Sequence, residues 1–405
     1  MNDRMSSNGA AACTVPFDEI LHRARSLSPY LKEKARQTEV DRRVSAETTA
    51  MLKDLQLNRL MQPKRFGGFE LGFTELVKLN FEVAQGCGST AWCLCLANTH
   101  NWLLGLFPGE VQEEVWADPS AMISGSYMPV GKCQKVEGGY KISGAWAFSS
   151  NCDNSSWYIV GGMVPPETEG APPTPTWFLL PQRDARIEDT WNSAGLAGTG
   201  SKTIVVDEPI FVPQLRALPL AAINSGQAPG TGVNKNPLYR LTFTGSAPFA
   251  LSSLPVGMAM GAVEDFKDAA RNKMAAQLGG PPLPMAELPF VQSALAEAAA
   301  AVDAAALLLL RDTAEIDAAF AKNEMISVDQ RIRHRRDHSY TGRLVERAGN
   351  VLFEVMGANG GSLSNPVQRA WRDINVAVRH ISLSWPNVGP MYGQYALGLK
   401  PKGTY

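Results

Sequence analysis

The sequence predicts a mainly α-helical protein with a central β-domain, in the chain order helices, strands, helices. Apolar residues recur at helical spacing over residues 17–116 and again from residue 248 onward. Between these stretches, residues 140–148 and 204–212 are rich in β-branched and aromatic residues and are bounded by glycine, asparagine or proline, as strands are. We therefore expect three parts: a helical domain at 17–119, a β-domain at 120–215, and a helical bundle with its tail at 247–405.

Two further segments lack a regular pattern. Residues 1–16 are mostly small and polar, and we expect a flexible N-terminus there. Residues 216–246 are rich in glycine, proline and asparagine, and we expect a long loop on the substrate side, because loops of that length in compact domains are often functional.

Composition narrows the class of protein. With 405 residues, of which 45% are hydrophobic, the chain is long enough for several packed units that share a large core. Lys plus Arg number 38 against 39 for Asp plus Glu, so the net charge is near zero. The protein therefore has no strong positive potential to attract nucleic acid, and a small-molecule substrate is favoured. The six cysteines lack the paired spacing of a zinc site or a disulfide framework, and we expect reduced thiols in a cytoplasmic protein with no metal. We see no secretory signal and expect no membrane span.

Four segments, in chain order, resemble conserved motifs of the acyl-CoA dehydrogenase superfamily. They are the Pro-Lys-Arg-Phe-Gly-Gly turn at 63–68, the strand pair at 138–151, the hairpin of 191–201 with 206–213, and the stretch 357–373 that ends in Arg372-Asp373. Each segment alone is weak evidence, because such turn sequences are common. Four of them in the same order as in the superfamily are specific evidence for the resemblance. The resemblance implies an N-terminal helical domain, a β-barrel-like middle domain and a C-terminal four-helix bundle. It further implies a homotetramer with flavin between the β-domain and the bundle.

One residue type that a dehydrogenase needs is missing. Dehydrogenases of this family take a proton with a glutamate, which lies either shortly after the Arg-Asp pair or in the helix that opens the bundle. This chain has no Asp or Glu after Asp373 and none at 209–263, and His380 stands near the first position. Together with Phe148-Ser149-Ser150, this resembles the two-component flavin-dependent monooxygenases, such as p-hydroxyphenylacetate hydroxylase and dibenzothiophene monooxygenase.

That resemblance implies roles for three residues. In this branch, reduced flavin and O2 form a C4a-hydroperoxyflavin, and the protein supplies orientation and a dry pocket. Ser150 matches a hydroxyl near flavin N5 that delays the loss of peroxide. His380 is our first candidate to take a proton from a phenol or to polarise the peroxide, because the pKa of an imidazole lies near working pH. His100, in an otherwise apolar helix, is the second candidate.

The resemblance also implies a set of cofactor-binding residues. Arg271 matches a family arginine that meets a flavin phosphate, while the glycine-rich residues after 356 form either a tight turn near the cofactor or a helix end. His334 and His338 lie in an arginine-rich stretch that we expect to be a solvated helix face or a subunit contact, with a flavin-phosphate contact as the alternative. The complete cofactor-binding set is Ser126, Ser149, Ser150, Arg271, Gly357, Asn359 and Gly360.

The leading functional hypothesis is a monooxygenase that hydroxylates a phenolic, indolic or polycyclic aromatic molecule with O2 as co-substrate. No GxGxxG motif follows a strand, so we expect a separate NAD(P)H:flavin reductase to supply reduced FMN by diffusion, with FAD as the alternative. Three hypotheses remain beside it. They are N- or S-oxygenation on the same fold, an acyl-CoA dehydrogenase-like oxidoreductase with an unrecognised base, and a non-catalytic flavin-fold binding protein.

Overall fold

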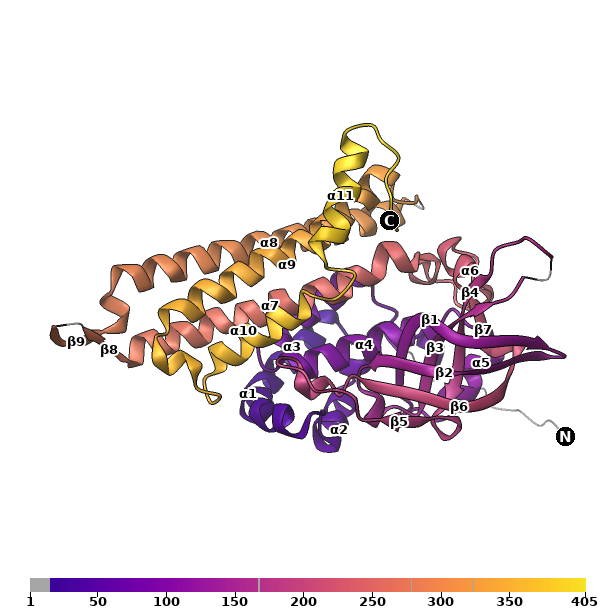
Figure 1. Ribbon diagram of the computed structural model, residues 1–405, viewed down its shortest axis with the longest axis horizontal. Helices are drawn as coiled ribbons and strands as arrows, with labels where there is room; N and C mark the ends of the chain where they lie inside the picture. The colour runs from indigo at the N-terminus through magenta and orange to yellow at the C-terminus, as the bar shows by residue number, and fades with distance from the viewer. Residues whose placement is uncertain (1–14, 167, 278, 323) are drawn as a thin grey trace, which may run out of the picture.

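The computed structural model describes residues 15–405 except 167, 278 and 323. The flexible N-terminus expected at 1–16 therefore lies almost wholly outside the described residues. Figure 1 shows the remaining chain as an N-terminal group of helices beside a β-domain, with a long helical bundle that extends away from both. The predicted order of helices, strands and helices is confirmed.

Five α-helices form the described N-terminal part. They are α1 (Phe17–Asp41), α2 (Ala46–Asp54), α3 (Phe73–Ala84), α4 (Gly88–Leu104) and α5 (Gly109–Trp116). The Ser45 hydroxyl caps α2 by accepting the Thr48 amide, which satisfies one of the free donors at a helix start. Helix α4 is buried along its whole length except at Leu96, because α3, α7 and the β-domain surround it. It is the element that joins the three parts.

The β-domain is one seven-stranded sheet in the order β5-β6-β2-β1-β3-β4-β7. Its pairs are antiparallel except β1 with β3, which is parallel. Trp146 lies at the centre of the domain's own core, and its indole N–H donates to the Gly161 carbonyl at 2.7 Å. The strands are β1 (Ile123–Val136), β2 (Gly139–Ser149), β3 (Trp157–Val164), β4 (Thr174–Pro181), β5 (Arg186–Glu188), β6 (Lys202–Pro213) and β7 (Ala217–Pro219).

The segment expected as a loop at 216–246 contains β7, α6 (Leu220–Asn224) and two single 3-10 turns, Pro229–Gly232 and Pro237–Arg240. The first bundle helix already begins at Phe243, four residues before the expected start at 247. Elements of one turn are too short to produce a periodic apolar pattern, so the sequence did not reveal them. Buried contacts hold the segment on the N-terminal helices: the Trp102 indole donates to the Leu238 carbonyl at 3.0 Å, and the Tyr239 hydroxyl donates to the Met61 carbonyl at 3.1 Å.

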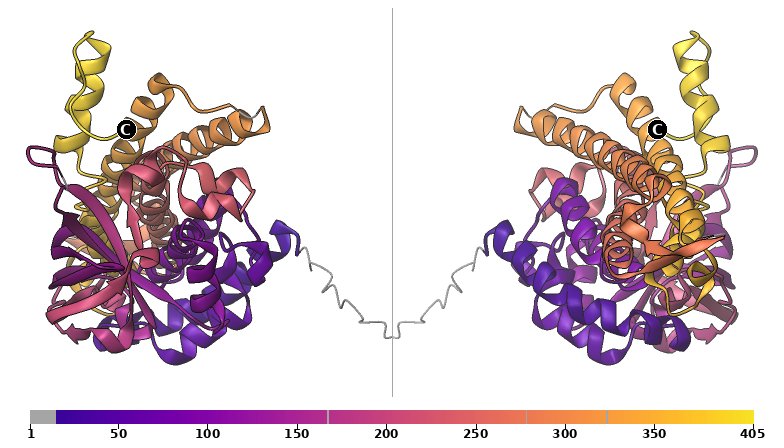
Figure 2. Two further views of the ribbon diagram at one scale, coloured as in Figure 1. Left: turned by 90° about the vertical axis from the view of Figure 1, so that its right-hand side faces the viewer. Right: turned by 90° about the vertical axis from the view of Figure 1, so that its left-hand side faces the viewer.

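The bundle is built from α7 (Phe243–Asn272), α8 (Pro289–Ala321), α9 (Val328–Val355) and α10 (Pro366–Ala377). A hairpin, β8 (Met274–Gln277) with β9 (Gly280–Pro284), joins α7 to α8, and α11 (Trp385–Ala396) projects beyond the rest of the chain (Figures 1 and 2). Both α7 and α8 are long and apolar enough to cross a membrane, which we did not expect from the sequence. The apolar stretch of α7 is 89% buried and that of α8 is 33% buried, so α7 is a core helix and α8 has an uncovered face.

His334 and His338 correct one expectation. Their side chains are 1% and 0% exposed, so the predicted solvated helix face is wrong for these two residues. Helix α9 turns them inward against α7, where both rings pack on Phe249. His334 also contacts Glu315 of α8 at 3.1 Å.

The loop before β6 fastens the β-domain to the bundle. The Leu196 amide donates to the Asp373 carboxylate of α10 at 2.6 Å, and the Arg372 guanidinium donates to the Ala194 carbonyl at 2.7 Å. A Cβ on Gly195 would lie only 2.3 Å from the Arg372 carbonyl oxygen, so glycine is required for this approach. The two domains meet backbone to backbone at this point.

We predict that Gly195→Ala destabilises the protein by about 1–3 kcal/mol, because the added methyl group pushes α10 away from the β-domain. Gly361→Ala is the control, since a Cβ there meets nothing within 4 Å. Urea unfolding of both variants measures the difference. Equal free energies of unfolding for the two would show that the close approach at Gly195 is not a constraint.

Candidate active site

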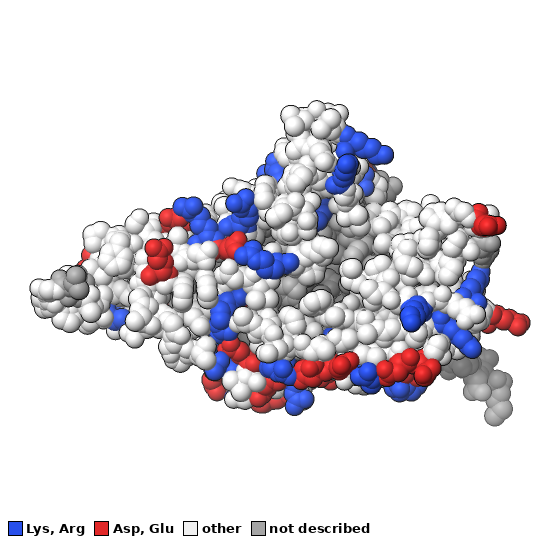
Figure 3. All heavy atoms as spheres, in the orientation of Figure 1, with Lys and Arg blue, Asp and Glu red and all other residues white. Residues whose placement is uncertain are grey.

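One face of α4 carries a stripe of three side chains, Trp92, Leu96 and His100, spaced four residues apart and therefore stacked along the helix. Leu96 is the one partly exposed residue of an otherwise buried helix, so the middle of this stripe borders open space. Figure 3 shows the surface hollowed between the bundle and the β-domain, on the side where α11 projects. We call Trp92, Leu96 and His100 the α4 stripe.

His100 lies at one end of the α4 stripe. Its Nδ1 is 2.6 Å from the Ile123 carbonyl oxygen, and because a carbonyl only accepts, Nδ1 carries the proton. Nε2 is left as an acceptor, and it is buried with no hydrogen-bond partner among the described residues. Burial lowers the pKa of His100 to about 4, so the ring is neutral at pH 7. The site therefore contains a buried Nε2 lone pair that can accept a hydrogen bond from a ligand.

His380 lies at the other end, in the turn that follows α10, with its ring centroid 6.2 Å from that of Trp92. Its Nδ1 accepts the Ser382 amide at 3.2 Å, so the neutral ring carries its proton on Nε2 and donates from there. Burial, and then the positive charge of Arg335, lower the pKa of His380 to about 4. The two histidines thus have opposite hydrogen-bonding roles.

Aromatic side chains surround His100. Tyr127 of β1 lies 5.9 Å from the His100 ring, 4.8 Å from Trp177 of β4 and 5.4 Å from Phe243, the first residue of α7. No sequence pattern relates Tyr127, Trp177 and Phe243 to one another, because they come from three distant elements. Aromatic walls of this kind suit a flat ligand.

Of the three serines predicted to bind flavin, Ser126 lies on β1, Ser149 ends the neighbouring β2 and Ser150 follows it. The Ser126 hydroxyl donates to a β2 carbonyl at 2.7 Å. The Ser149 hydroxyl is fully buried and has no partner in the part of the chain that the structure describes. Beside it, Phe148 is 70% exposed with φ at +65°, a strained conformation of the kind found at ligand sites. An orphaned hydroxyl and an exposed ring fit an aromatic cofactor here.

The other predicted cofactor residues lie elsewhere. Helix α7 has 30 residues, about 45 Å at 1.5 Å per residue, and Arg271 is in its last turn whereas Phe243 begins it. The Arg271 guanidinium is exposed and pairs with Asp268 at 3.4 Å. Within one chain, the structure therefore does not bring Arg271 to the serines.

Gly357, Asn359 and Gly360 lie at the end of α9, near the same end of α7. Gly357 has φ at +62°, which favours glycine, and it starts a 3-10 turn over Ala358–Gly361. Asn359 lines a polar cavity of about 310 Å³ between this turn and the end of α7. The other residues that line it are Asp265, Ala269, Lys273, Ser362, Ser364, Asn365 and Pro366.

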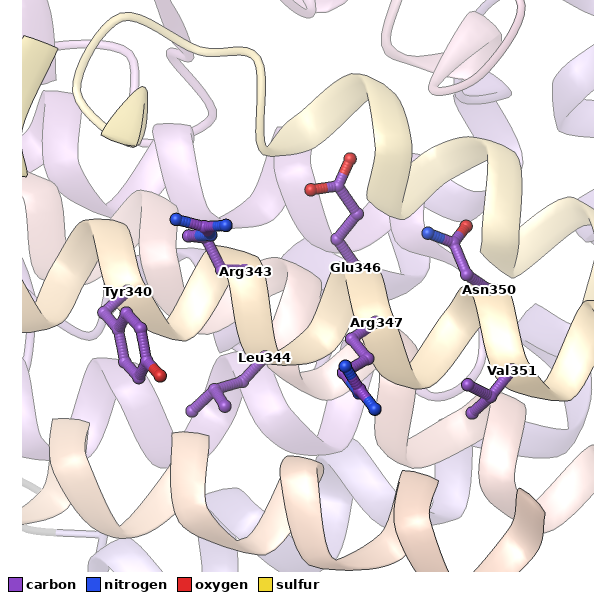
Figure 4. Close-up of a pocket in the computed structure, with 7 residues that line it drawn as sticks. All are labelled: Tyr340, Arg343, Leu344, Glu346, Arg347, Asn350 and Val351. Carbon is purple, nitrogen blue, oxygen red and sulfur yellow. The ribbon is translucent and has the colours of Figure 1, made fainter. Parts of the chain in front are cut away.

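A larger groove of about 630 Å³ runs along the outer side of α9. Figure 4 shows Tyr340, Leu344, Arg347 and Val351 pointing toward α8, while Arg343, Glu346 and Asn350 point toward α10. Ion pairs of Arg347 with Glu297 and of Glu346 with Arg379 border it. One helix provides all its lining, and neither site histidine contributes, so we do not assign it to the candidate active site.

A third polar cluster lies between α8 and α9, where Asp312, Glu315 and His334 bring possible metal-ligand atoms within 4.8 Å of one another. Arg311 donates to Asp312 at 2.7 Å, and Arg333 pairs with Glu315. These two guanidiniums already neutralise the carboxylates and repel a cation, so the cluster is best explained as a structural charge network.

Known proteins resemble this chain over its whole length. Residues 249–385 match the family model described as acyl-CoA dehydrogenase, C-terminal domain. The FADH2-dependent resorcinol hydroxylase, oxygenase component, of Rhizobium sp. is 41% identical over 412 residues, covering 100% of both chains. The oxygenase subunit HsaA, a flavin-dependent monooxygenase of Rhodococcus jostii, is 36% identical over 381 residues, covering 94% of this chain and 98% of the relative.

Solved structures agree. The 3-HSA hydroxylase from Rhodococcus sp. RHA1 superposes with a TM-score of 0.89 at 34% identity, covering 96% of this chain and 99% of the other. XiaF from Streptomyces sp., in complex with FADH2 and glycerol, superposes with a TM-score of 0.87 at 26% identity, covering 96% and 98%. The chain therefore belongs to the oxygenase components of two-component flavin-dependent monooxygenases, which share the acyl-CoA dehydrogenase fold.

Proposed function

We propose that this enzyme hydroxylates a small phenol, using O2 and a reduced flavin delivered by a separate NAD(P)H-dependent reductase. The observation that carries the proposal is the pair of neutral histidines with opposite hydrogen-bonding roles at the two ends of the α4 stripe. Two relatives are named for phenolic substrates: the resorcinol hydroxylase at 41% identity, and the p-hydroxyphenylacetate 3-hydroxylase oxygenase component of Acinetobacter baumannii at 27%.

The two histidines have different roles in this proposal: one accepts a hydrogen bond and the other donates one. When bound, the reduced flavin supplies the activation of oxygen, which we take to pass through the C4a-hydroperoxide. The unpartnered Nε2 of His100 accepts the phenol O–H, which makes the ring carbon more nucleophilic. The Nε2–H of His380 donates to an oxygen atom at the other end of the α4 stripe. The sequence predicts His380 either as the base or as the group that polarises the peroxide. Because its accepting nitrogen is occupied by the Ser382 amide, we propose His100 as the base and keep the second role for His380.

The competing functions fit the site less well. An N- or S-oxygenase has no phenol proton to remove, so the buried Nε2 of His100 would have no substrate proton to accept. A dehydrogenase needs a free carboxylate, whereas Asp373, the acid nearest to His380 in the sequence, is buried and holds the Leu196 amide. Reduction of the oxidised flavin by an acyl-CoA would nevertheless support the dehydrogenase, and no flavin binding at all would support a non-catalytic protein.

For the cofactor, we propose reduced FAD in place of the reduced FMN we first expected, because the resorcinol hydroxylase is named as FADH2-dependent and XiaF is described with FADH2. Ser126, Ser149 and Ser150 would face the flavin ring. Arg271, Gly357, Asn359 and Gly360 lie too far along the bundle to reach the same molecule within one chain, so we propose that a neighbouring subunit contributes them. The polar cavity at Asn359 and Lys273 suits a phosphate-bearing group.

The uncovered face of α8 supports the expected homotetramer. Phe290 is 56% exposed and Leu307 is 68% exposed, on a helix whose apolar stretch is 33% buried. Large exposed apolar side chains that share one helix mark subunit contacts. The described cysteines, Cys87, Cys93, Cys95, Cys133 and Cys152, are free thiols, which supports the cytoplasm as compartment.

We predict that His100→Gln lowers the rate of phenol hydroxylation by about 100-fold or more, because the amide offers no basic nitrogen. Product and H2O2 are measured together with reduced FAD and resorcinol as the probe. The expected result is less product and more H2O2, with flavin affinity unchanged. His22→Ala, an exposed histidine on α1, is the control. Unchanged coupling of oxygen to product in His100→Gln would exclude His100 as the base.

The depressed pKa values predict how activity depends on pH. Both His100 and His380 have a pKa of about 4, so hydroxylation should stay constant from neutral pH down to about 5 and fall as the pH drops through about 4. Loss of activity with a midpoint near 6.5 in a steady-state pH profile would contradict this, since it would mean that the rings titrate as exposed histidines do.

The same shifts predict a pH dependence of stability. Between the folded pKa of about 4 and the unfolded value of 6.5, the unfolded chain binds more protons, so the free energy of unfolding falls as the pH is lowered through this window. Each such histidine contributes at most about 1.4 kcal/mol per pH unit. His100→Gln should therefore reduce the slope of the urea midpoint against pH. An unchanged slope would show that His100 is already protonated in the folded protein.

We further predict that Leu307→Glu dissociates the tetramer, because a charge in an apolar subunit contact is costly. Val130→Glu is the control, since Val130 is 55% exposed on β1, away from the bundle. Sedimentation velocity gives the mass of each variant. A tetramer that survives Leu307→Glu would place the subunit contact elsewhere.

A further inference from the structure

A chain of three buried hydroxyl groups leads away from Ser150. The Ser150 and Ser201 hydroxyl oxygens are 2.7 Å apart, and Ser201 is 2.7 Å from the Thr199 hydroxyl. The Thr199 hydroxyl donates in turn to the Leu196 carbonyl at 2.8 Å. All three side chains are buried, so these groups bond to one another and not to bulk water. We call Ser150, Ser201 and Thr199 the hydroxyl chain.

The direction of every hydrogen bond in this chain follows from its last member. A carbonyl oxygen has no hydrogen to give, so the Thr199 hydroxyl must donate to Leu196. Each hydroxyl has one hydrogen, and therefore Ser201 donates to Thr199 and Ser150 donates to Ser201. The single hydrogen of Ser150 therefore points toward Ser201. Its oxygen is left as an acceptor only.

The residue that ends the chain is held through both its amide and its carbonyl group. Its amide, Leu196 N–H, donates to the buried Asp373 carboxylate at 2.6 Å, and its carbonyl also accepts the Trp191 indole at 3.1 Å. Hydrogen bonds that share one direction polarise each other, so the arrangement resists reversal. Ser149 differs, because its hydroxyl has no partner among the described residues and is free to rotate between donating and accepting.

We propose that the hydroxyl chain makes this enzyme select the reduced flavin over the oxidised flavin. The inference rests on the proposed placement of Ser150 beside flavin N5. In the reduced flavin N5 bears a hydrogen and donates, whereas in the oxidised flavin N5 is a bare acceptor. As a fixed acceptor, Ser150 can accept the hydrogen of reduced N5. Toward oxidised N5 it presents a lone pair against another lone pair, which is repulsive. Ser201 and Thr199 are then positioning residues that set which redox state is retained.

This selection suits an enzyme whose flavin arrives reduced and leaves oxidised. Affinity for the reduced form lets the oxygenase capture what the reductase releases. Weak affinity for the oxidised form lets the spent flavin depart. Neither consequence requires Ser201 or Thr199 to contact the flavin.

The test compares dissociation constants instead of turnover. Reduced FAD is titrated anaerobically and oxidised FAD in air, and the ratio Kd(oxidised)/Kd(reduced) is taken for each protein. In Ser201→Ala the Ser150 hydrogen is released and can turn toward oxidised N5, so we expect the ratio to fall by about 5- to 10-fold, the value of one hydrogen bond. Ser155→Ala removes a buried hydroxyl that donates to the Asn151 carbonyl, outside the chain, and should keep the wild-type ratio.

Two further variants separate the possible failures. Thr199→Val removes the donor to Leu196 at nearly constant volume and should lower the ratio in the same sense, which keeps the test decisive if Ser201→Ala does not fold. Ser150→Ala should weaken binding of reduced FAD. If Ser150→Ala changes neither constant, the proposed placement of Ser150 is wrong. If it weakens reduced FAD while both Ser201→Ala and Thr199→Val keep the wild-type ratio, the hydroxyl chain is overturned and the placement stands.

Discussion

The hydrogen bond between the Leu196 amide and the Asp373 carboxylate holds the β-domain on the bundle, and the candidate site lies at this joint. Asp373 is buried, and burial raises its pKa to about 6, so it remains charged at neutral pH mainly because the Leu196 amide and nearby arginines stabilise the anion. The same residue ends the hydroxyl chain through its carbonyl. Leu196 thus takes part both in the contact between the two domains and in the hydrogen bonds that fix the direction of the Ser150 hydroxyl.

Burial also sets the protonation of the site. His100 and His380 are both neutral at pH 7, one because it is enclosed and the other because it is partly enclosed and faces the field of Arg335. Arg335 is itself buried and donates to the Ser382 and Thr404 carbonyls, which keeps its charge near His380. Among the described residues no carboxylate forms a salt bridge with it. A neutral pair with fixed tautomers can accept at one end and donate at the other, which a pair of charged imidazoles cannot do.

The length of α7 is the reason why, in our proposal, one chain does not complete the cofactor site. Its first turn joins the aromatic wall at Tyr127 and Trp177, while its last turn carries Arg271 about 40 Å away. The uncovered face of α8 runs along the same bundle. An assembly that covers this face would also bring a second chain to the first, so oligomerisation and cofactor binding are linked in our proposal.

The sequence by itself determined the order of helices, strands and helices and the flavin-dependent oxygenase family, because apolar periods and short motifs are local, as is the absence of acids after Asp373. It did not reveal that His334 and His338 are buried, since a helix with many arginines has the same pattern whichever face packs. Only the tertiary structure decided which nitrogen of each site histidine is free and which way the Ser150 hydrogen points. Those properties depend on partners such as Ile123, Ser382 and Leu196, which no sequence spacing relates to them.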